Sequence, residues 1–113
     1  MGVEENKQID PLKSGVFGLV DPAIDAVIYV TSAEGSMYKA FQKYKGDLFR
    51  QVGPVDLYRY LSVMKFCHGT YVTLKCLEEC STREELKHAK KKWITKLQAK
   101  GEAFLNKQEG RNK

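Results

Sequence analysis

Apolar side chains recur at intervals of three and four residues between positions 26 and 48. This spacing places them on one side of an α-helix, and seven positions follow it without a break. Asp21 and Pro22 come just before, and an acidic N-cap followed by proline is typical of a helix start. The sequence therefore predicts a long helix over residues 22–45. The positions in step are Ala26, Val30, Ala33, Met37, Phe41, Tyr44 and Leu48.

A strand is the alternative for part of this stretch. Residues 27–31 read Val-Ile-Tyr-Val-Thr, a run that favours β-structure, and residues 32–36 have the composition of a loop. We favour the helix because seven positions in step are harder to obtain by chance than five neighbouring strand formers.

Residues 47–80 are predicted to form one or two further helices. Apolar side chains from Leu57 to Cys67 share a helical face, and Gly69 is expected to end or kink this helix. Residues 70–77 fit either a strand, because two sets of side chains alternate there, or a continuation of the helical face. We favour the helix again.

A capped helix is predicted over residues 82 to about 105. Ser81-Thr82-Arg83-Glu84 matches a capping box, in which the Ser81 hydroxyl accepts a hydrogen bond from the backbone N–H of Glu84 and the glutamate side chain bonds back. Acidic residues in the first turn and lysines after it suit the helix dipole. The side chains expected in the core are Leu86, Ala89, Trp93 and Leu97.

These elements predict a mainly α fold, a small helical bundle of three to five helices. The 113 residues have the length of one domain. We expect a flexible arm at 1–14, one helical domain at 15–105 and a frayed basic tail at 106–113. The alternative is an α+β fold with short strands near 26–32 and 70–77.

Positive charge is concentrated near the C-terminus. The chain carries a net charge of +5, but residues 1–57 hold six basic and eight acidic side chains, and residues 83–113 hold ten basic and four acidic ones. Lysines on the exposed faces of one helix can bind an acidic protein or the phosphate backbone of a nucleic acid. The predicted partner-binding or anion-binding lysines are Lys87, Lys90, Lys91, Lys92 and Lys96.

A second predicted contact region is Tyr58-Arg59-Tyr60. Three neighbouring residues cannot all face one core, and tyrosine and arginine are enriched where proteins bind one another. We therefore expect a non-catalytic, intracellular interaction module or complex subunit that holds a protein partner. The alternatives are non-specific binding of nucleic acid or of an anionic membrane through the same lysines, and, third, a small enzyme or redox protein.

Cysteine and histidine offer only a weak candidate for a metal site. Cys76 and Cys80 would share a helix face, with His88 nearby, but their spacing matches no usual structural zinc motif. No metal or other cofactor is therefore predicted. The place of Cys80 just before a helix N-terminus would lower the pKa of its thiol, which is the basis of the redox alternative.

No catalytic motif is recognised. The chain has no nucleophile elbow, no phosphate-binding glycine loop and no zinc-protease motif, so an enzyme is not the expected class. Three cysteines, few and odd in number, and an acidic N-terminus predict an intracellular, cytoplasmic protein. Gly2 after Met1 is a possible acylation site, although Asn6 does not fit the motif.

Overall fold

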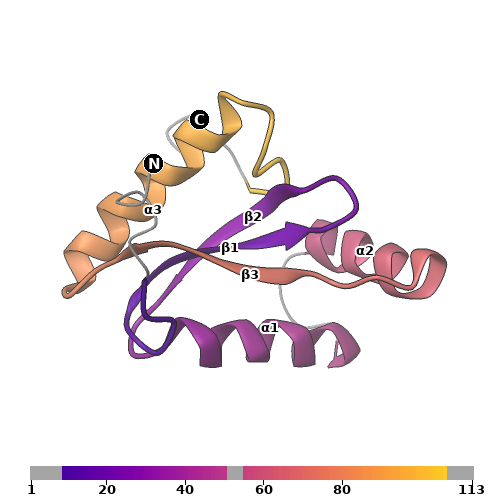
Figure 1. Cartoon of the computed structure of the whole chain (residues 1–113), viewed down its shortest axis with the longest axis horizontal. Helices are drawn as coiled ribbons and strands as arrows, with labels where there is room; N and C mark the ends of the chain where they lie inside the picture. The colour runs from indigo at the N-terminus through magenta and orange to yellow at the C-terminus, as the bar shows by residue number, and fades with distance from the viewer. Residues whose placement is uncertain (1–8, 51–54, 107–113) are drawn as a thin grey trace, which may run out of the picture.

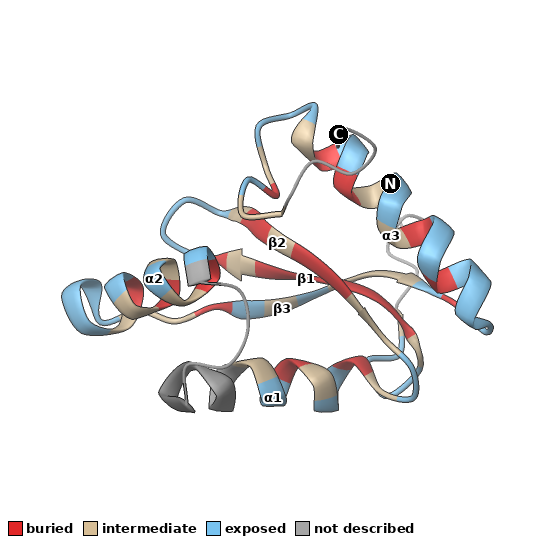
Figure 2. Cartoon of the chain, turned by 180° about the vertical axis from the view of Figure 1, so that it is seen from behind, coloured by how far each residue is buried: buried red, intermediate tan, exposed pale blue. Residues whose placement is uncertain are grey.

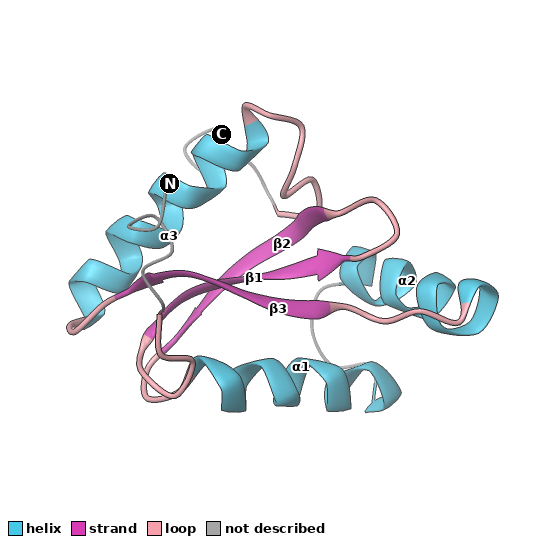
Figure 3. Ribbon diagram, viewed as in Figure 1, coloured by secondary structure: helices cyan, strands magenta, loops and turns pink. Residues whose placement is uncertain are grey.

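The chain folds as an α+β protein, not as the helical bundle predicted from its sequence. A computed structural model describes residues 9–50 and 55–106. Within these ranges three strands form one antiparallel sheet, and three α-helices pack around it (Figures 1 and 3). The elements are β1 (Gly15–Asp21), β2 (Ala26–Ala33), α1 (Met37–Arg50), α2 (Val55–Val63) with its π-helical extension η2 (Met64–His68), β3 (Thr73–Glu79) and α3 (Arg83–Gln98).

The molecule has three layers with β1 at the centre of the middle one. The strand order is β2-β1-β3, so both edges of β1 are paired with a neighbouring strand. One core lies between the sheet and the helices α1 and α2, and includes Phe17, Leu19 and Ile28. The second core lies between the sheet and α3, and includes Val16 and Val27. Figure 2 shows β1 buried along most of its length.

The predicted helix over 22–45 is wrong in its first half. Residues 22–25 form a turn, and the next eight residues form β2, as the alternative interpretation of residues 27–31 proposed. β2 is paired with β1 and packed on both sides, so its apolar residues do not alternate with polar ones. Gly35, with a φ of 100°, separates the strand from the helix that follows.

The second half of the same pattern is helical. α1 begins at Met37, where the Ser36 hydroxyl accepts a hydrogen bond from the backbone N–H of Lys39. Met37 and Phe41 are buried against the sheet, and the ring of Tyr44 packs edge-on against Phe17. The helix continues through Gly46 and ends at Arg50.

The predicted helix over residues 70–77 is also wrong, because β3 occupies this stretch. Gly69 ends the preceding helical segment in a left-handed conformation, as predicted. After it the chain turns back as an edge strand against β1, with Thr73, Lys75 and Glu79 exposed. The two regions of strand, near 26–32 and 70–77, are those of the alternative α+β interpretation.

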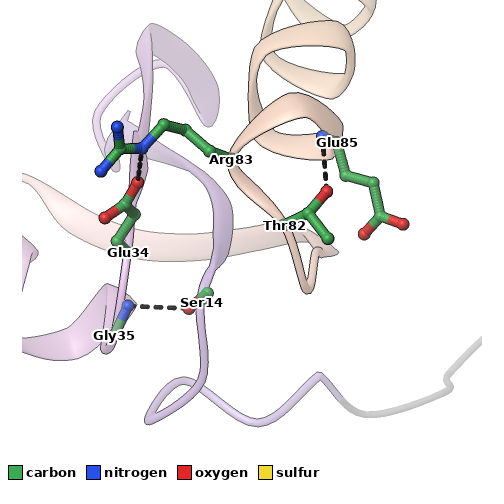
Figure 4. A network of polar contacts seen from close by, with 6 residues as sticks. All are labelled: Ser14, Glu34, Gly35, Thr82, Arg83 and Glu85. Carbon is green, nitrogen blue, oxygen red and sulfur yellow. Dashed lines mark hydrogen bonds and ion pairs between the residues drawn. The ribbon is translucent and has the colours of Figure 1, made fainter.

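Helix α3 is present, but its cap lies one residue later than predicted, and it ends at Gln98 instead of near residue 105. The hydroxyl of Thr82, not Ser81, accepts a hydrogen bond from the backbone N–H of Glu85 (Figure 4), and the Glu85 carboxylate accepts one from the backbone N–H of Ser81. Leu86, Ala89 and Leu97 are buried as predicted, whereas Trp93 is half-buried. Ile94, which had not been assigned to the core, is 1% exposed.

The segment after α3 covers the outer edge of β2. The backbone N–H groups of Ala103 and Leu105 donate hydrogen bonds to Val27 and Ile28, and the Asn106 amide bonds both the N–H and the carbonyl of Val30. The rest of the predicted tail, and most of the predicted arm, lie outside the described residues. None of the helices that the structure describes is long and apolar enough to cross a membrane.

Candidate functional site

The exposed side of α3 is the candidate anion-binding face. The apolar side chains of α3 pack in the core between this helix and the sheet, and the lysines between them are mostly exposed to solvent. Figure 2 shows buried and exposed positions following one another along α3. The sixteen residues of α3 carry six basic and two acidic side chains. Of the lysines predicted to bind, Lys87, Lys91, Lys92 and Lys96 are exposed and Lys90 is half-buried.

Three of these lysines line one hollow beside α3. It has a volume of about 350 Å³, and the described residues that line it are Lys87, His88, Lys90 and Lys91. The described part of the chain places no carboxylate in this lining and no ion pair on these lysines. The hollow is therefore a concave, positively charged spot that has no acidic partner among these residues.

Lys92 and Lys96 are held on the other flank of α3. Lys92 Nζ lies 2.8 Å from Glu78 Oε1, which also accepts a hydrogen bond of 2.8 Å from Trp93 Nε1. These two hydrogen bonds, the one from Lys92 first, lower the pKa of the Glu78 carboxyl. Lys96 Nζ lies 4.8 Å from the centre of the Trp93 ring. Lys92 is thus less available to an outside anion than Lys87 or Lys91.

Arg83 at the start of α3 is likewise held in an ion pair. Its Nε lies 2.6 Å from Glu34 Oε2, in the loop between β2 and α1 (Figure 4). The hydrogen bond to Arg83 lowers the pKa of Glu34 and raises that of Arg83. The backbone N–H of Gly35 in the same loop donates a hydrogen bond to the hydroxyl of Ser14, which lies just before β1. This contact network ties the first turn of α3 to the loop beside it.

The predicted Tyr58-Arg59-Tyr60 region lies on α2, away from the lysines of α3. Arg59 is exposed, whereas both tyrosines are half-buried. The Tyr60 hydroxyl donates a hydrogen bond of 2.7 Å to Asp21 Oδ2, and burial and this bond raise the pKa of Tyr60 to about 12. No contact in the structure tests whether this region binds a protein, so that role stays a prediction.

The weak metal candidates are not brought together. Cys76 lies on β3 and packs against the core on the α1 and α2 side, whereas Cys80 belongs to the core under α3. Burial raises the pKa of both thiols, and for Cys80 this is opposite to the effect expected from the helix N-terminus. Among the residues described, no three histidine, cysteine or acidic side chains form a group suited to a metal.

Sequence reasoning missed a buried acidic residue, Asp21. It was assigned to a helix cap, but its carboxylate accepts hydrogen bonds from the backbone N–H of Ala23 and from Tyr60. Its side chain lies in the wall of a large hollow beside α2. The Asp-Pro pair is also a turn signal, and the turn interpretation would have placed Asp21 at the end of a strand.

Comparisons of the chain with protein-family models, with curated proteins and with solved structures found no match.

Proposed function

We propose that this protein binds nucleic acid without sequence preference, through the lysine face of α3. The observation that carries the proposal is the hollow lined by Lys87, His88, Lys90 and Lys91, which brings three lysine side chains together on one side of α3. A phosphate group placed there would meet several cations and displace none of the ion pairs that the described residues form.

The chemistry of these side chains favours the backbone of the nucleic acid over its bases. Lysine is a flexible point charge, and neutralising phosphates releases counterions whatever the sequence. Arginine, which reads guanine with two parallel hydrogen bonds, is represented on α3 only by Arg83, and its guanidinium is paired with Glu34. Binding is therefore expected to depend strongly on salt and little on sequence.

An anionic membrane is the less favoured ligand of the same face. A helix that lies in a membrane surface inserts apolar side chains between the lipids, with lysines on its other side. In α3 the large apolar side chains face the sheet, and its exposed residues are charged or polar. The lysine face thus has charge but no apolar group to insert.

The test is a double charge-neutralising variant, Lys87→Gln with Lys91→Gln. Both lysines line the hollow and neither takes part in a described ion pair, so the fold should not change. We expect the affinity for a short fluorescein-labelled DNA duplex to fall about tenfold or more at low salt, measured by fluorescence anisotropy.

The matched control is Lys39→Gln with Lys43→Gln on α1. These lysines are exposed, have the same four-residue spacing and remove the same charge from the opposite layer of the molecule. The control should bind DNA within about twofold of the parent chain. Equal losses in the two variants would show that total charge, not the α3 face, drives binding.

Two other results would overturn the proposal. One is the absence of any DNA or RNA binding at low salt. The other is sedimentation with vesicles that contain phosphatidylserine, lost in the Lys87 and Lys91 variant, together with no nucleic-acid binding. The second result would assign the same lysines to a membrane surface.

A further inference from the structure

A second hollow, larger and mostly apolar, opens at the other end of the sheet. It has a volume of about 830 Å³ and lies where the β1–β2 turn, α2 and the segment after α3 meet. The first two of these segments are seen close together in Figure 1. Its volume is within the range of about 300–1,000 Å³ that is usual for small-molecule sites. The apolar side chains of its wall include Ile24, Val63, Met64 and Leu105.

Large apolar side chains are unusually exposed around this hollow. Ile24 and Val63 in its wall are 52% and 49% exposed. Phe104, which is 48% exposed, packs its ring against the Tyr60 ring at a centroid distance of 5.6 Å. Three apolar side chains from three separate segments thus gather at one place, which is typical of a binding surface.

Asp21 is a buried acidic residue in the wall of this hollow. The residue is 5% exposed and forms part of the wall. Its Oδ1 accepts one hydrogen bond from the backbone N–H of Ala23, and its Oδ2 accepts one from Tyr60. A carboxylate offers about four acceptor positions, so two remain. The ion pairs that the structure describes do not include Asp21.

A buried carboxylate without a cation is costly, and a ligand that supplies the cation removes that cost. Among the described residues, the other titratable side chains in the wall are Asp56, Arg59, Tyr60 and His68. Asp56 and Arg59 are both exposed, so Asp21 is the buried charge among them. The ligand that fits this hollow is therefore a molecule with an apolar part, which packs against the walls, and a positively charged group, which contacts Asp21.

We propose that this hollow binds a small organic cation with an aromatic body, whose amidinium or ammonium group bonds the Asp21 carboxylate. An amidinium donates two parallel N–H bonds and matches a carboxylate in a bidentate geometry. The aromatic body lies against Val63, Ile24 and Tyr60. This inference concerns a different layer of the molecule from the lysine face and does not depend on nucleic-acid binding.

The test compares three molecules of nearly the same shape, benzamidine, benzamide and benzoate. Each is added to the ¹⁵N-labelled full-length chain, and amide shifts are followed by NMR. Benzamidine should shift the backbone amides of residues 21, 23–25, 59–64 and 103–105 in a saturable way. Benzamide should bind at least about tenfold more weakly, since it lacks the charge, and benzoate should not bind there.

Asp21→Asn should weaken benzamidine binding at least about tenfold while leaving benzamide binding nearly unchanged. The matched control is Asp25→Asn, which removes the same charge from an exposed residue of the same turn, outside the wall of the hollow. If Asp21→Asn does not fold, Val63→Trp, which fills the hollow, must abolish the benzamidine shifts.

The proposal is overturned if benzoate binds as tightly as benzamidine. The hollow would then bind an anion, through Arg59, as well as a cation. The proposal is also overturned if benzamidine shifts no amide in these segments, or if Asp25→Asn weakens binding as much as Asp21→Asn. Benzamidine binding that survives Val63→Trp would place the ligand elsewhere on the molecule.

Discussion

Gly18 allows the central strand to lie close to its neighbour. A Cβ atom built at this position would lie 2.7 Å from Cγ1 of Val27, on the side of the sheet that faces α3. Real Cβ atoms do not approach other carbons so closely, and Val27 is itself packed in the core. The absence of a side chain at residue 18 is therefore part of the packing between β1 and β2.

Gly18→Ala should lower the free energy of unfolding by about 1 to 2 kcal/mol. The added methyl group forces Val27 to move, and this outweighs the smaller entropy of the unfolded chain. Urea denaturation followed by circular dichroism measures the change. In a Val27→Ala background, where the clashing methyl groups are gone, the same substitution should cost much less. An equal cost in both backgrounds would contradict this account of the contact.

Glu78 couples β3 to α3 through one carboxylate. Its pKa is lowered, chiefly by the hydrogen bond from Lys92, so the folded state releases its proton more readily than the unfolded state. The stabilisation is present above the unfolded pKa of about 4.3 and is lost as the pH falls through the folded pKa.

Glu78→Gln should therefore reduce stability at pH 7 by less than about 1 kcal/mol, because the carboxylate is more than a third exposed. The difference between the parent chain and the variant should shrink as the pH falls below about 4.3. Thermal unfolding at a series of pH values measures it. A difference that stays constant down to pH 3 would show that the charge of Glu78 contributes nothing.

At the level of the elements, two neighbouring hydroxyl residues, Ser81 and Thr82, have different roles in the cap of α3. Thr82→Ala should lower the free energy of unfolding by about 1 kcal/mol, because it leaves the backbone N–H of Glu85 without its acceptor. Ser81→Ala is the control and should cost only a few tenths, since Ser81 contributes its backbone N–H to the cap. A larger cost at Ser81 would place the cap where the sequence pattern alone predicted it.

The sequence predicts α3 well because its signals are local. A capping hydroxyl, acidic residues in the first turn and an apolar stripe all lie within one helix. The cap differs from the prediction by one residue, and the helix ends at Gln98 instead of near residue 105. The inward positions Leu86, Ala89 and Leu97 follow from the same stripe. The lysine face is the complement of that stripe, so it was predictable too.

The strands were not predictable in the same way, since the sheet that stabilises them is formed by distant residues. β2 contains a bulge near Ile28, where the pairing with β1 shifts between Leu19 and Val20. The bulge and the burial of both faces remove the alternation that identifies a strand, and leave spacings that resemble those of a helix.

β1 was not predicted at all. It contains two glycines, which are uncommon in strands, and its apolar residues face both layers. Gly15 and Gly18 are there because neighbours come close: a Cβ at residue 15 would collide with the backbone carbonyl of Glu78. Such tertiary reasons for a glycine cannot be read from neighbouring residues.

On the scale of the whole molecule, the fold places the lysine face and the exposed apolar side chains in different parts of the surface. The three lysines around the smaller hollow lie on α3, in one outer layer, whereas the apolar hollow is bounded by α2 and the turn beside it. The Asp21 hollow could not be predicted from the sequence, because it joins residues as far apart as 21, 60 and 105. Separate variants can therefore test each surface without disturbing the other.

The salt dependence of DNA binding tests the central claim most directly. The logarithm of the binding constant should fall linearly with the logarithm of salt concentration, by about 0.9 per phosphate neutralised on a duplex. In the Lys87→Gln, Lys91→Gln variant this slope should decrease by about 2. In the Lys39→Gln, Lys43→Gln variant it should not change. An unchanged slope in the first variant, or equal decreases in both, would contradict the assignment of the lysine face of α3 as the nucleic-acid site.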